Sequence, residues 1–380
     1  MSETKMSRLL AAGAYGCVYH PPPEKCATCV GRSTLAKVCT HGVVKLMDAK
    51  SAREEEESLV VIGKIDPQGH YHWKLERVCD APPSTYHWPR DARGQKCRLY
   101  LGPSPKLLYF PYGGRPFEDF VTGKDTFGLV DFLAMRRIFL GIIQFQKHGF
   151  VHGDIKGPNL VYVRASRPSS SARSGLPFYI KFIDFSLSFE TSDPDLPESV
   201  YAYWPPEAIL LFSSKSYSTA DYALRVREAS LGQVQNISPL AIQRRVVEEL
   251  RGPRFESWLR QMKRWASDRR NFYKTTVREK FDIYGLGVVL LSLYHFGTFS
   301  SELRSNETFM RGLKRLGKAG MTFDARYRPS GKEYYRLYKR LVTNAFTPER
   351  VERGKEKLGP TSLPASTPAP FIKGKGKFPI

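Results

Sequence analysis

His148–Val163, HGFVHGDIKGPNLVYV, is the stretch of this chain that decides its fold. It reads as a polar loop between an amphipathic helix and a β-branched strand, and it places Asp154, Lys156 and Asn159 on one short arc. The downstream stretch IKFIDFSL reads as a buried strand that ends at Asp184. A carboxylate to orient a hydroxyl, a lysine to neutralise phosphate, and an amide with a second carboxylate to hold Mg²⁺ are the groups that phosphoryl transfer uses.

The two stretches together resemble protein kinase motifs. The catalytic loop H-R-D-L-x-x-x-N and the metal-binding turn D-F-G stand here as HGDIKGPN and DFS, and the alternative is a chance match in a polar loop. The resemblance implies an α+β, two-lobed protein kinase-like fold. It places a small β-rich N-lobe at 1–113, with a Cys/His-containing insertion at 21–41, and a larger, mostly helical C-lobe at 114–345, with a helical insertion at 208–280. Residues 346–380 form a basic Pro/Ser-rich tail that we predict to be disordered.

The N-terminal part carries a glycine turn between two short strands, in LLAAGAYGCVY. Glycines let backbone amides approach a phosphate closely because no Cβ intervenes. Compared with the kinase pattern G-x-G-x-x-G-x-V, whose first glycine is missing here, the resemblance assigns nucleotide binding to Ala11, Gly13, Gly16 and Val18. It also places adenine beside the backbone at Pro111 and Tyr112, in the turn after the strand KLLYF.

Lys45 lies in the short apolar strand GVVKLM, where a solvated lysine is not expected. By the same resemblance it contacts the α- and β-phosphates of ATP. Ala49–Ile65 is a helix candidate, and one of its glutamates should pair with Lys45. Glu55 shares a face with the apolar residues and is our first choice, and Glu56 is the second.

Features of the C-terminal half resemble protein kinases rather than small-molecule kinases. The segment WPPE ends at Glu207, which would need a buried arginine, and Arg328 in DARYRPS is the candidate. Phe281–His295 is apolar nearly all round, which predicts a helix at the centre of a domain. Asp282, at its start, resembles the aspartate that holds the backbone of the catalytic loop.

Two departures from the family pattern change the expected regulation. Gly153 replaces the arginine of H-R-D, so that a phosphorylated activation segment would lack its usual guanidinium partner. We hypothesise that activity does not require phosphorylation of that segment. The HGD form also occurs in small-molecule kinases. Ser186 replaces the glycine of D-F-G and restricts the backbone at the turn without removing a metal ligand.

The six cysteines all lie in the first quarter of the chain, and in a reducing compartment they are not expected to form disulfides. Thiolates and imidazole are the ligands that Zn²⁺ prefers. A structural zinc site and a loop with free thiols are therefore both open interpretations of Cys26, Cys29, Cys39 and His41.

The insertion at 208–280 has two interpretations. Either an aromatic stripe marks a helix packed on the large lobe, or the segment docks substrate or nucleic acid. The stripe consists of Phe255, Trp258, Leu259, Met262 and Trp265.

The chain of 380 residues has a net charge of +22, which favours nucleic acid or another acidic partner at a basic surface. No apolar run reaches membrane-spanning length and the N-terminus lacks a signal-peptide core. We therefore expect a soluble protein in the cytoplasm, the nucleus or a virion.

The resemblance implies an ATP- and Mg²⁺-dependent serine/threonine protein kinase. Asp154 would orient the acceptor hydroxyl, Lys156 would stabilise the phosphoryl group, and Asn159 and Asp184 would ligate Mg²⁺. A lysine two residues after the aspartate is similar to serine/threonine rather than tyrosine kinases. The alternatives are a pseudokinase scaffold that binds nucleic acid or protein through its basic surface, and a small-molecule kinase. The divergent motifs resemble protein kinases of large DNA viruses.

Overall fold

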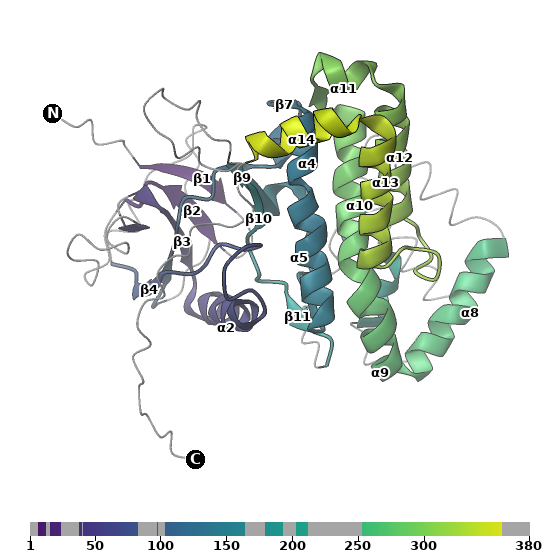
Figure 1. Ribbon diagram of the computed structural model, residues 1–380. Helices are drawn as coiled ribbons and strands as arrows, with labels where there is room; N and C mark the ends of the chain where they lie inside the picture. The colour runs from purple at the N-terminus through teal and green to yellow at the C-terminus, as the bar shows by residue number, and fades with distance from the viewer. Residues whose placement is uncertain are drawn as a thin grey trace.

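The computed structural model describes residues 7–12, 16–23, 38–39, 41–82, 97, 103–163, 179–192, 203–211 and 253–358. Within them, a β-rich N-terminal region precedes a helical C-terminal region, so the expected mixture of α and β structure is confirmed (Figure 1). None of the helices in these ranges is both long and apolar enough to cross a membrane.

The N-terminal region is built on a five-stranded antiparallel sheet with the strand order β1-β2-β3-β5-β4. Its strands are β1 (Arg8–Ala12), β2 (Cys17–His20), β3 (Val43–Met47), β4 (Arg77–Asp80) and β5 (Lys106–Phe110). β3 pairs with β2 on one side and β5 on the other, and it is buried from Val44 to Met47. A polar side chain on this strand therefore needs a partner within the protein.

Helix α2 (Ala49–Ile65) packs against β5 and has the predicted bounds. Asp48 caps it, since its carboxylate accepts a hydrogen bond from the Ser51 backbone N–H at 2.9 Å. Its buried residues recur every three or four positions and include one acidic side chain, Glu55. The helix therefore delivers a carboxylate to the same interior as β3.

The described part of the C-terminal region consists of helices with three short pieces of sheet. The helices are α3 (Glu118–Val121), α4 (Leu129–Ala134), α5 (Arg136–Lys147), α8 (Pro253–Ser267), α9 (Arg269–Phe272), α10 (Arg278–Phe296), α11 (Ser301–Ser305), α12 (Glu307–Gly320), α13 (Gly331–Ala345) and α14 (Pro348–Lys357). The 3-10 helices η2 (Gly157–Asn159) and η3 (Pro206–Leu211) and the π-helix η4 (Tyr273–Val277) complete them. The strands are β6 (Arg115–Pro116), β7 (Thr126–Phe127), β8 (Phe150–Val151), β9 (Leu160–Val163), β10 (Tyr179–Phe182), β11 (Phe189–Glu190) and β12 (Thr298–Phe299).

Helix α10 is the centre of this region. It is buried without interruption from Phe281 to Leu293, and α5, α12 and α13 pack around it (Figure 1). A helix that is apolar all round is stable only when it is enclosed in this way. The predicted central helix is therefore confirmed.

The part of the 208–280 insertion that the structure describes contains α8, and its aromatic stripe is core. Trp258 is completely buried and packs on Phe323, with ring centroids 4.7 Å apart. The helical-layer interpretation is confirmed for this part, and residues 212–252 lie outside the described ranges.

Helix α14 forms within the tail for which the composition predicted disorder. Pro348 occupies the first turn of the helix after Thr347, where its missing N–H costs no hydrogen bond. Val351 and Leu358 pack against the main core. The prediction of disorder is therefore wrong for this segment, and residues 359–380 lie outside the described ranges.

The expectation of reduced cysteines is also wrong. Cys17 on β2 and Cys97 form a disulfide, with their Cα atoms 5.9 Å apart. Cys39 and Cys79 are disulfide-bonded as well. The cross-links lie in the N-terminal region.

Candidate active site

Lys45 on β3 holds two carboxylates from distant parts of the chain. Its Nζ lies 2.5 Å from Oε2 of Glu55 on α2 and 2.9 Å from Oδ1 of Asp184. Burial alone would lower the pKa of Lys45, but the charges of Asp184 and Glu55 outweigh burial and the pKa is raised. The lysine is therefore a fixed cation. Its predicted pairing with Glu55 is confirmed, and Glu56 is exposed.

Three residues of the predicted nucleotide-binding segment, Ala11, Gly16 and Val18, are described by the structure. Val18 on β2 pairs with Lys45 across the sheet, and Ala11 on β1 pairs with Val18 beyond a register shift. A Cβ atom on Gly16 would lie 2.8 Å from Cε of Lys45, so that a side chain there would displace the lysine. Gly13 lies outside the described residues.

The loop after β8 brings Asp154, Lys156 and Asn159 together. Oδ2 of Asp154 accepts hydrogen bonds from Nζ of Lys156 at 2.6 Å and from Nδ2 of Asn159 at 2.8 Å. No donor among the described residues bonds to Oδ1. Burial raises the pKa of Asp154, and the nearby Lys156 opposes that shift without cancelling it. The carboxylate is thus oriented, with one oxygen available to a hydroxyl donor.

Asp282 on α10 forms hydrogen bonds with the backbone of the same loop. Its two carboxylate oxygens accept the backbone N–H groups of His152 at 2.9 Å and Gly153 at 3.0 Å. Nε1 of Trp204 donates to the carbonyl oxygen of Gly153. Burial raises the pKa of Asp282 to about 6, although the two N–H donors oppose the shift. The predicted contact between Asp282 and the loop backbone is confirmed.

Gly153 has a backbone that other residues rarely adopt. Its φ is 78°, and a Cβ atom would lie 2.1 Å from the carbonyl oxygen of Leu187. A glycine at position 153 is therefore required by the path of the chain.

Asp184 also has a positive φ, of 63°, and it is the non-glycine residue with this property in the described part of the chain. A carboxylate in the left-handed region is uncommon and is typical of a functional turn. Its Oδ1 accepts the hydroxyl of Ser186 at 2.9 Å in addition to Lys45. Burial raises its pKa, but Lys45 outweighs burial and the pKa is lowered to about 2.

A backbone hydrogen bond joins this turn to the loop. The N–H of Ile183 donates to the carbonyl oxygen of Asn159 at 3.0 Å. Asp154 and Asp184 therefore belong to one site, as the sequence predicted, and Lys45 lies in contact with it.

His152 is a site residue that sequence reasoning did not single out. The ring is completely buried, lies 4.7 Å from the ring of Phe185, and accepts the N–H of Asp154 at Nδ1. Burial lowers its pKa to about 4, so the ring is neutral at pH 7 and Nε2 carries the proton. The apolar residues on its N-terminal side were the available signal for burial.

Pro111 and Tyr112 lie in the turn after β5, which is an inner strand of the sheet. The Tyr112 ring stacks on His20 of β2, with centroids 4.1 Å apart and an interplanar angle of 17°. Sequence reasoning missed His20, because the contact joins two strands that are not neighbours in the sheet.

Glu207 and Arg328 form the predicted buried pair. The two guanidinium nitrogens lie 2.5 and 3.1 Å from the two carboxylate oxygens, and both side chains are buried. Arg328 donates further to the carbonyl oxygens of Thr322, Lys280 and Phe323. A buried ion pair with every donor occupied fixes the segment that follows Trp204.

The metal predictions require correction. The described residues contain no group of three or more His, Cys, Asp and Glu side chains that could hold a metal ion. For zinc, the sulfur of Cys39 is in a disulfide and cannot act as a thiolate ligand beside His41. Cys26 and Cys29 lie outside the described residues. For magnesium, the same absence in the described residues contradicts the predicted ligands Asn159 and Asp184, and Oδ1 of Asp184 bonds instead to Lys45 and Ser186.

Comparison with known proteins adds no identification. No protein-family model matches the chain, and no curated protein matches it. The inference about function therefore depends on the geometry of the site.

Proposed function

We propose that the chain is a serine/threonine protein kinase, which transfers the γ-phosphoryl group of ATP to a protein hydroxyl. The observation that carries the proposal is the double ion pair of Lys45 with Glu55 and Asp184. A buried lysine between two carboxylates that are 129 residues apart (184 minus 55) serves no evident packing purpose. It presents a positioned cation to the phosphates of a nucleotide.

The other site residues would divide the reaction between them. Oδ1 of Asp154 accepts the proton of the incoming hydroxyl, and because burial raises the pKa of this carboxyl it is a stronger base than an exposed aspartate. Lys156, hydrogen-bonded to the same side chain, stabilises the negative charge on the transferring group. The backbone at Pro111 and Tyr112 would lie against adenine, and Ala11, Gly16 and Val18 would cover the phosphates.

The proposal includes a two-lobed arrangement, with the N-terminal sheet and α2 as the small lobe and the helices around α10 as the large one. The contact between Lys45 and Asp184 would then span the two lobes. The Glu207–Arg328 pair supports a protein as the phosphate acceptor. The motifs resemble those of protein kinases, which have this pair, whereas small-molecule kinases lack it.

The test is transfer of label from γ-labelled ATP, in a buffer containing Mg²⁺, to acidic and basic protein substrates and to small hydroxyl compounds. We expect labelled protein and unlabelled small molecules. Asp154→Asn should reduce the rate by about 10²- to 10⁴-fold, the usual contribution of a general base. Transfer that survives this substitution, or label found only on small molecules, would contradict the proposal.

A matched control uses Asp119→Asn, a carboxylate that is paired with Arg115 and lies outside the catalytic loop. It changes the net charge by the same amount. Its rate should stay close to that of the wild type, because surface ion pairs contribute little.

A further inference from the structure

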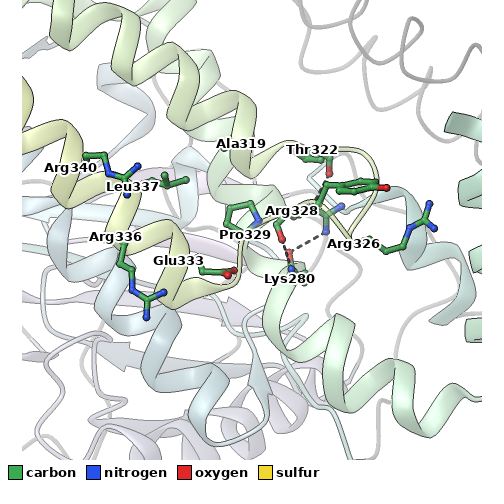
Figure 2. Close-up of a pocket in the computed structure, with 11 residues that line it drawn as sticks. Lys280, Ala319, Thr322, Arg326, Arg328, Pro329, Glu333, Arg336, Leu337 and Arg340 are labelled. Carbon is green, nitrogen blue, oxygen red and sulfur yellow. Dashed lines mark hydrogen bonds between the residues drawn. The ribbon is translucent and has the colours of Figure 1, made fainter.

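A hollow with a volume of about 490 Å³ lies where the C-terminal end of α12, the start of α13 and the start of α10 meet (Figure 2). None of Lys45, Asp154 and Asp184 lines it, and Arg328 is the lining residue that also forms the buried pair with Glu207. Five of its eleven lining residues are cationic, and the lining consists of Lys280, Ala319, Thr322, Arg326, Tyr327, Arg328, Pro329, Glu333, Arg336, Leu337 and Arg340.

Two of the five cations are already neutralised. Arg328 forms the floor, and its guanidinium is occupied by Glu207 and by backbone carbonyls. Arg326 is paired with Asp324, with Nε 2.9 Å from Oδ2, and its side chain lies at the opposite end from Arg336 and Arg340 (Figure 2). Neither arginine has charge left for a ligand.

Three cations remain, which are Lys280, Arg336 and Arg340. We call these three residues together with Glu333 the basic pocket. Arg336 and Arg340 follow one another by one turn of α13 and are exposed. In the described part of the chain neither arginine forms an ion pair with a carboxylate. Lys280 is half-buried and gives one donor to the carbonyl oxygen of Arg328.

Glu333 reduces the charge of the basic pocket but does not neutralise it. Its Oε2 accepts the N–H of Ser330 at 2.7 Å and the hydroxyl of Ser330 at 2.8 Å, which fixes the carboxylate at the first turn of α13. Three cations and one carboxylate leave a charge of about +2. A phosphate monoester carries about −1.5 to −2 at pH 7, whereas a phosphodiester carries −1.

We propose that the basic pocket binds a phosphoserine or phosphothreonine side chain of a protein segment. Arginine forks fit phosphate oxygens in pairs, and clusters of arginines are a recurring means of recognising phosphorylated peptides. The volume lies in the range of sites for molecules larger than a phosphate ion, so residues flanking the phosphate have space. Pro329, Leu337 and the exposed ring of Tyr327 offer them apolar contacts.

A nucleic acid is disfavoured by the same geometry. Its affinity comes from many phosphate contacts along a continuous basic stripe. Here the lining carries the fixed carboxylate of Glu333. A chain of phosphodiesters would meet this negative charge, whereas one phosphate group can avoid it.

The test measures binding of a fluorescein-labelled peptide of glycine and alanine with one central phosphoserine to the full chain, by fluorescence anisotropy and without ATP. The result is therefore independent of phosphoryl transfer. We expect the phosphoserine peptide to bind more tightly than the same peptide with serine, and inorganic phosphate to compete. Arg336→Ala/Arg340→Ala should weaken binding by about 10- to 100-fold, because it removes charge-assisted hydrogen bonds.

The control Arg311→Ala/Arg315→Ala removes two exposed arginines with the same spacing from α12, outside the basic pocket. It should keep the wild-type affinity. Equal binding of the serine and phosphoserine peptides would overturn the proposal, as would equal losses in the two double variants. So would binding of a labelled oligothymidylate in the absence of phosphopeptide binding.

Discussion

Lys45 joins three separate parts of the chain through one ammonium group. β3 carries it, α2 supplies Glu55, and the turn after β10 supplies Asp184. The resemblance to protein kinase motifs predicted that one glutamate of α2 pairs with Lys45. The helical phase of α2 then indicated Glu55, because this residue shares a face with Leu59 and Ile62.

Glu55→Gln tests the positioning role of this contact. The substitution keeps the shape but removes one of the two charges that fix Lys45, so we expect phosphoryl transfer to fall by about 10- to 100-fold, as misplacement of a binding group does. Glu56→Gln, the exposed neighbour, is the matched control and should leave the rate unchanged. Equal rates in the two variants would show that Glu55 does not position the lysine.

Asp282 makes the stability of the fold depend on pH. Its pKa is raised from 3.8 to about 6 by burial, so the folded state binds the proton more tightly than the unfolded state. Protonation of Asp282 therefore adds to the free energy of unfolding. This contribution is fully present below about pH 4 and is lost as the pH rises through about 6. It amounts to about 3 kcal/mol, at about 1.4 kcal/mol per pH unit.

Asp282→Asn cannot undergo this loss. The free energy of unfolding of the variant, minus that of the wild type, should therefore increase by up to about 3 kcal/mol from pH 4 to pH 7. Urea denaturation across this range measures the difference. A constant difference would show that the aspartate does not titrate as stated.

At the scale of elements, the sequence was most informative where one feature decided the outcome. The all-round apolarity of α10 predicted its central place, and the acidic helix α2 was recovered with its bounds. The polar composition of α14 led to a wrong prediction of disorder. The helix is ordered because Val351 and Leu358 pack against the main core. The basic pocket could not be predicted, because it depends on how the ends of α10, α12 and α13 meet in space.

The Glu207–Arg328 pair links η3 to the turn before α13, and breaking it should destabilise the whole C-terminal region. Arg328→Met leaves Glu207 charged and buried, which costs about 3–5 kcal/mol. The double variant Glu207→Leu/Arg328→Met should cost less than the single one, because no unpaired charge remains. Thermal and urea unfolding measure both.

Arg326→Met is the control for this element, since its pair with Asp324 is partly exposed. The expected cost is about 0–1 kcal/mol. A double variant as unstable as Arg328→Met alone would contradict the argument from the unpaired charge.

For the molecule as a whole, the disulfides change the balance between its two halves. The helical region is stabilised by two large hydrophobic clusters, whereas the sheet has smaller ones of its own and is cross-linked. The pairing was not evident from the sequence, because the spacing of cysteines does not reveal which of them meet in space. Disulfides persist in oxidising surroundings.

The Cys17–Cys97 disulfide closes a loop with a sequence separation of 80. Cys17→Ser/Cys97→Ser should lower the free energy of unfolding by about 4 kcal/mol, through the larger conformational freedom of the unfolded chain. Equilibrium denaturation of the variant beside the wild type, with a probe in the N-terminal region, measures it. An unchanged midpoint would show that the cross-link does not constrain the unfolded state.

The hydrogen bonds between Asp282 of α10 and the backbone of His152 and Gly153 have a consequence for inactivation by heat. The helix at the centre of the core also fixes the backbone beside Asp154, so the chain has no means of melting one while keeping the other. On heating, activity should be lost at the temperature at which the helical region unfolds, and not in an earlier step.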